Sequence, residues 1–98
     1  MHASDYLQAL RRAIWNIHGS HAVHVGTVAV KKTANGGILW EGPIEVFDLV
    51  GHARAKRSYA WGFPRDPAGE PLNIFTVLEV PPVDSPQAAV GASLVGPA

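Results

Sequence analysis

The sequence contains no cysteine, so the chain can form neither disulfide bonds nor thiolate metal sites. It also has no net charge, because eight basic residues balance eight acidic residues. No overall field therefore attracts nucleic acid or an anionic membrane, and binding of either needs a local patch. No apolar run approaches the roughly 20 residues of a membrane-spanning helix, and residues 1–12 lack the apolar stretch of a signal peptide. These absences favour a cytoplasmic protein that binds no membrane.

The chain is short, with 98 residues, and we expect it to form one domain over residues 1–98 with residues 96–98 frayed. A domain of this size buries only about two-thirds of the surface that its unfolded chain exposes. Without disulfides, the remaining stabilising devices are core packing and self-association. We expect self-association to contribute.

Helical patterns occur near both ends of the chain. Apolar residues recur at intervals of three and four between Asp5 and Gly19, which predicts an amphipathic helix over residues 5–18. Ser85 followed by Pro86 is typical of a helix start, because a capping side chain precedes a proline in the first turn. We therefore expect a second helix near the end of the chain.

Four segments have the composition of strands. The first, residues 21–32, is rich in β-branched residues, but its alternation changes phase, so we expect a bulge near Gly26. Asn35-Gly36 predicts a hairpin turn, after which the return strand begins at Ile38. The other two strands are expected at residues 58–63 and 72–80, joined by a long loop.

Together these elements predict an α+β fold, in which four consecutive strands form an antiparallel sheet. The N-terminal and C-terminal helices are expected to pack on one face of that sheet. Residues 52–57 are expected to form a single helical turn. Glu41 and Glu45 fall opposite the apolar face of the second strand, so they are predicted to lie in solvent.

The stretch RAKRSYAWGF, residues 54–63, combines cations with aromatic residues at alternate positions, which share one face of a strand. Residues 57–63 partly resemble the first ribonucleoprotein motif, in which aromatic rings stack on RNA bases. Ser58 replaces the glycine of that motif, and the order of elements differs from the RNA-recognition fold. We therefore favour a core or interface strand after a solvated turn. The alternative is a weak single-stranded nucleic-acid binder that uses Arg54, Lys56 and Arg57.

Three histidines, His18, His21 and His24, could supply imidazole ligands to a metal ion. In a regular strand His21 and His24 lie on opposite faces, so the three rings diverge. We therefore expect neither a metal site nor a cofactor, and we expect His18 to lie at a helix C-terminus.

A second hypothesis is a small-ligand pocket or an active site around Asp48, His52, Tyr59 and Trp61. A carboxylate near an imidazole can orient it as a general acid or base, and a tyrosine hydroxyl can bind a polar substrate. The sequence shows no nucleophile elbow and no phosphate-binding glycine loop. These four residues are therefore candidate ligand-binding residues, and no catalytic residue is assigned.

Residues 45–63 and 80–90 resemble a group of small uncharacterised bacterial proteins, which implies a bacterial, cytoplasmic origin but no activity. Several apolar side chains exceed what two short helices can cover: Phe47, Leu49, Trp61, Phe75 and Val77. We therefore predict a non-enzymatic interaction module that forms a homodimer by burying part of its sheet.

Overall fold

The computed structural model describes residues 3–62 and 73–95 of the chain. It has the predicted α+β class, with a four-stranded antiparallel sheet and one helix near each end of the chain. The expected frayed tail, Phe63 and the long loop lie outside the described residues. The elements are α1 (Ala3–His18), β1 (His21–Ala34), β2 (Gly37–Val50), β3 (Arg57–Gly62), β4 (Ile74–Leu78) and α2 (Pro86–Val95).

The sheet is a meander in which each strand pairs with the next one along the chain, in the order β1-β2-β3-β4. The aromatic strand β3 pairs antiparallel with β4, and Trp61 lies opposite Phe75. The predicted pairing of these two strands is therefore confirmed. In the described part of the chain, β1 and β4 are the two edges of the sheet.

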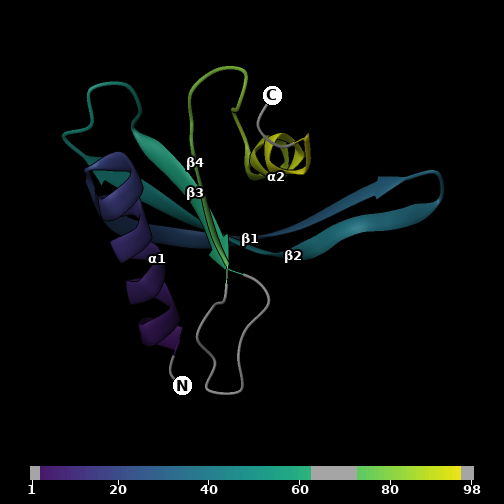
Figure 1. Cartoon of the computed structure of the whole chain (residues 1–98), viewed down its shortest axis with the longest axis horizontal. Helices are drawn as coiled ribbons and strands as arrows, with labels where there is room; N and C mark the ends of the chain where they lie inside the picture. The colour runs from purple at the N-terminus through teal and green to yellow at the C-terminus, as the bar shows by residue number, and fades with distance from the viewer. Residues whose placement is uncertain (1–2, 63–72, 96–98) are drawn as a thin grey trace.

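The two helices lie on opposite faces of the sheet (Figure 1), so the expectation that both cover one face is wrong. Tyr59 and Trp61 of β3 pack with Val90 of α2. The intervening Ala60 packs in a separate core with Leu10 of α1. The physical reason is that β2 and β3 carry buried side chains on both faces, and each apolar face needs its own cover.

The predicted bulge in β1 is confirmed, and it falls at Val25. His24 is opposite Phe47 and Gly26 is opposite Val46, so Val25 has no partner of its own in β2. The extra residue restores the phase of the strand beyond it. As a result, the later part of β1 turns its valines towards α2, where Val30 is buried.

The far end of the β1–β2 hairpin extends away from both helices and from β3 (Figure 1). Only Glu45–Asp48 of β2 pair with β3, so the ribbon is two-stranded farther out in the described structure. The predicted turn is present, with positive φ at Asn35 and Gly36. We call residues 31–41 the hairpin arm.

No helical turn forms between β2 and β3, so the prediction for residues 52–57 is wrong. Nδ1 of His52 accepts hydrogen bonds from the backbone amides of Arg54 and Ala55, both at 3.0 Å. This side chain satisfies amides that a helical turn would otherwise use. The connection is therefore a side-chain-stabilised bend.

Neither helix in the described ranges is both long enough and apolar enough to cross a membrane.

Candidate functional site

Polar side chains lie close together at the end of the sheet where β2 ends and β3 begins. Asp48 and Arg57 are directly opposite each other in the β2–β3 ladder. Nε and Nη2 of Arg57 both lie 3.1 Å from Oδ1 of Asp48. Because both side chains are largely exposed, such a pair stabilises a fold by only about 1 kcal/mol or less.

Tyr59 connects this polar end to the core. Its ring is buried, and its hydroxyl donates a hydrogen bond to Oε2 of Glu79, just after β4. Burial of the ring, together with the neighbouring Glu79 carboxylate, raises the pKa of Tyr59 to about 12. The hydroxyl therefore remains a neutral donor throughout the physiological pH range.

An open pocket of about 450 Å³ lies at this end of the sheet, lined by Asp48, Leu49, Lys56, Arg57 and Glu79. Two carboxylates face two cations, so the charges compensate one another. None of the lining side chains is a hydroxyl, thiol or imidazole group. The pocket can therefore offer salt bridges and hydrogen bonds to a polar molecule.

The four predicted pocket residues have separate surroundings. Asp48 lines the pocket, and the hydroxyl of Tyr59 is hydrogen-bonded to Glu79, which also lines it. Trp61 is buried in the core, where it stacks on Phe75 with ring centroids 5.4 Å apart. The structure therefore brings Asp48 and Tyr59 to the same end of the sheet. Trp61 instead packs in the hydrophobic core beneath α2, which we call the α2 core.

The His52 side chain accepts hydrogen bonds from backbone amides of its own bend, and Asp48 forms an ion pair with Arg57. Burial lowers the pKa of His18, and the neighbouring His52 lowers it further, while a hydrogen bond to Thr76 opposes both effects. The effect of His52 is the smallest of these three contributions to the pKa of His18.

Comparison with family models, curated proteins and solved structures gives no match for the chain.

A buried polar cluster on the α1 face was missed from the sequence. Glu45 is only 6% exposed, so the prediction that it lies in solvent is wrong. Its Oε1 accepts hydrogen bonds from Nε2 of His24 at 2.8 Å and from Oγ1 of Thr27 at 2.6 Å. The burial follows from the bulge, because it sets which β1 side chains flank Glu45. In the sequence, these three residues are too far apart to show any local pattern.

The remaining histidines point to different partners. His18 is hydrogen-bonded to Thr76, His21 stacks on Trp15, and His24 binds Glu45. Within residues 3–62 and 73–95, no three side chains of metal-ligating type lie close enough together to hold an ion.

The basic residues of the nucleic-acid alternative lie in and near the bend. Arg54 is exposed, Lys56 lines the pocket, and Arg57 is paired with Asp48. Tyr59 and Trp61 are buried, so their rings are not open to stacking by a base. These cations and these aromatic rings therefore have different roles in the fold.

Proposed function

We propose that this protein is a non-enzymatic interaction module that forms a homodimer through its hairpin arms. The observation that carries the proposal is the exposure of two large apolar side chains near the tip of the arm. Ile38 is 56% exposed and Leu39 is 61% exposed. They are neighbours near the tip of the ribbon, where Leu39 is an extra residue without a partner in β1, so the tip exposes two adjacent apolar side chains.

The arm itself favours a partner. A two-stranded ribbon is at best marginally stable in water, and a third strand or another covering element stabilises it. Within the described residues, the base of the arm is supported where Trp40 packs against the α2 core. A contact along the outer ribbon supplies the missing cover.

A second copy of the chain offers a suitable surface. An open, mainly apolar pocket of about 300 Å³ lies at the base of the arm, lined by Ala29, Val30, Lys31, Glu41, Gly42 and Pro43. Two arms that run antiparallel about a two-fold axis place each tip near the base of the other arm. Zero net charge adds no overall repulsion between the copies.

The surface proposed here differs from the one expected from the sequence. Phe47 and Trp61 were expected to drive association, but the two helices bury both of them within the chain. Only Phe75 of the predicted set is exposed. The arm is therefore the better candidate for the dimer contact.

Light scattering coupled to size exclusion, at tens of micromolar protein, tests the proposal. We expect the unmodified chain to elute as a dimer and Leu39→Asp to elute as a monomer. Val50→Asp is the matched control, because Val50 is similarly exposed at 58% but lies outside the arm. A monomeric unmodified chain, or a Leu39→Asp variant that stays dimeric, would contradict the proposed dimer.

The setting of the module is also a proposal. The resemblance of residues 45–63 and 80–90 to small bacterial proteins supports a bacterial, cytoplasmic origin. Fractionation of the native host, with an antibody against the protein, tests the location.

A further inference from the structure

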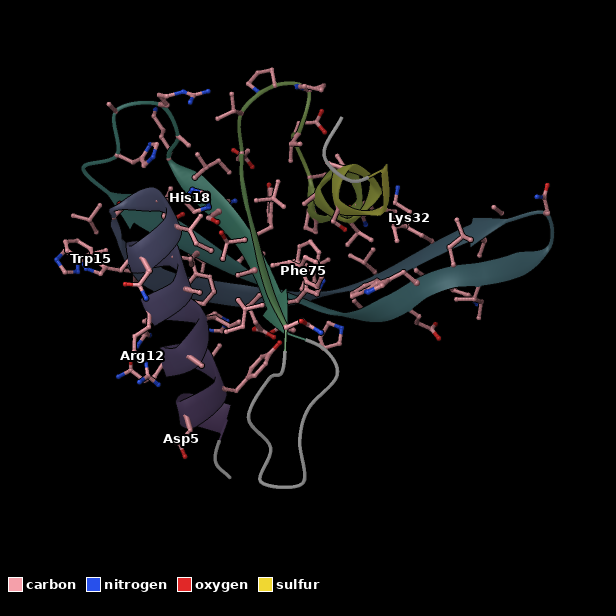
Figure 2. All side chains as sticks on the ribbon, in the orientation of Figure 1. Asp5, Arg12, Trp15, His18, Lys32 and Phe75 are labelled. Atoms are coloured by element: carbon pink, nitrogen blue, oxygen red, sulfur yellow. The ribbon has the colours of Figure 1, made fainter. Side chains whose placement is uncertain are left out.

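One side of α1 carries a polar stripe that its packing in the sheet does not use. Gln8, Arg11, Arg12 and Trp15 are spaced by three or four residues, so they share one face of the helix. Figure 2 shows Arg12 and Trp15 projecting from the same side of α1, away from α2. The apolar residues that hold α1 on the sheet, such as Leu10 and Ile14, lie on a different face.

This stripe borders an open groove of about 270 Å³ between α1 and the start of β1. We call it the arginine groove; its lining residues are Gln8, Arg11, Arg12, Trp15, His21 and Ala22. It contains two guanidinium groups and one imidazole, and none of its lining residues is acidic. The groove therefore attracts negative charge, in contrast to the charge-balanced pocket beside Asp48.

The two guanidinium groups lack anionic partners in the described residues, where the ion pairs are His24–Glu45 and Arg57–Asp48. Arg11 reaches Oε1 of Gln8 only at 3.5 Å, the outer limit of a hydrogen bond. Its Nε is buried and has no hydrogen-bond partner in the part of the chain that the structure describes. Arg11 therefore keeps hydrogen-bonding capacity that no described residue uses.

Trp15 adds an aromatic surface to these charges. Its ring stacks on His21, with centroids 4.5 Å apart and an interplanar angle of 23°. The stack covers one face of the indole, yet 49% of the side chain remains exposed. The other face of the indole is therefore open to a planar ring.

We propose that the arginine groove binds an anionic ligand with a planar ring, of the mononucleotide class. Arg11 and Arg12 hold the phosphate through charge-assisted hydrogen bonds. The base stacks on the open face of Trp15, and Gln8 is available for a hydrogen bond to the ligand. His21 stacks on the opposite face of Trp15 and helps to hold the indole in place. The site shares no residue with the hairpin arm, so a test of ligand binding and a test of the dimer are independent.

Calorimetric titration of the full chain with AMP, adenosine and inorganic phosphate separates the contributions of charge and ring. We expect AMP to bind, and we expect adenosine and phosphate each to bind at least about tenfold more weakly, because each lacks one of the two contacts. Raising the salt concentration weakens AMP binding, since the phosphate contact is electrostatic.

Three variants complete the test. Trp15→Ala and Arg12→Gln are each expected to weaken AMP binding by about tenfold or more. Arg54→Gln is the matched control, because it removes an exposed cation outside the groove and should leave AMP binding unchanged. Circular dichroism checks that each variant is folded. Absence of AMP binding at millimolar concentration, equal binding of AMP and phosphate, or unchanged binding by folded Trp15→Ala would overturn the proposal.

Discussion

Val46 and Phe47 are neighbours in β2, yet they belong to different hydrophobic cores. Val46 packs with Tyr59 and Trp61 beneath α2, whereas Phe47 packs with residues of α1 on the other face of the sheet. The sheet is therefore the middle layer of three, and each helix protects one of its faces. Loss of either core leaves an apolar sheet face without cover.

Phe47→Ala tests the α1 core. Phe47 is fully buried, so truncation removes its contacts with α1 and leaves a cavity. We expect the free energy of unfolding to fall by about 3–5 kcal/mol, as measured by urea denaturation. Phe75→Ala is the control, because Phe75 stacks on Trp61 but is exposed, and its loss should cost about 1 kcal/mol. A loss of only about 1 kcal/mol in Phe47→Ala would show that Phe47 is not a core residue.

Glu45 and Glu41 form a matched pair of glutamates in one strand with opposite burial. Glu45→Ala leaves His24 and Thr27 without their shared acceptor, and we expect a loss of about 1–3 kcal/mol in unfolding free energy. Glu41→Ala changes an exposed side chain and should alter stability by no more than about 0.5 kcal/mol. Thermal and urea unfolding of both variants measure the difference. Similar small effects would place Glu45 in solvent after all.

His18 makes the stability of the fold depend on pH. Its pKa is lowered in the folded state from the ordinary value of 6.5, so the unfolded chain binds the proton more readily. The neutral ring stabilises the fold fully above pH 6.5, and this contribution is lost as pH falls through the folded-state pKa. Urea unfolding at a series of pH values should show this loss. His18→Asn should show a shallower loss, and an unchanged slope in that variant would refute the assignment.

Tyr59 makes the stability of the fold depend on pH in the alkaline range. Its pKa rises from 10.0 to about 12 in the folded protein, so folding favours the neutral hydroxyl. This contribution to stability is present below pH 10 and is lost as pH rises towards 12. The chain has two tyrosines, so the ultraviolet absorbance titration of Tyr59→Phe is subtracted from that of the unmodified chain. The difference should have its midpoint near pH 12; a midpoint at pH 10 would mean that the ring is solvated.

Local patterns in the sequence were sufficient to predict most of the helices, strands and turns. The hairpin turn at Asn35-Gly36 needs two residues that tolerate positive φ, and such residues are visible directly. The bulge near Gly26 follows from a phase change within one strand. Only neighbouring residues enter either inference, so no knowledge of tertiary contacts is needed.

The roles of individual polar side chains could not be found in this way. Asp48 and His52 look like a pair in the sequence, but across the sheet Asp48 meets Arg57, and His52 turns to the backbone of its own bend. Glu45 looks solvated, but His24 and Thr27 reach it from β1. Each of these partners depends on strand register or on the path of a bend.

The sequence by itself determined the α+β class, the order of the elements and the meander, because helix and strand periods and turn residues act over a few positions. Only the tertiary structure decided that the helices cover opposite faces, that Glu45 is buried and that Arg11, Arg12 and Trp15 line a groove beside His21. The physical reason is that these features depend on how distant elements pack and on which face each connection reaches. The absence of cysteine and net charge excluded disulfides and an overall electrostatic field, while packing decided where local charge gathers.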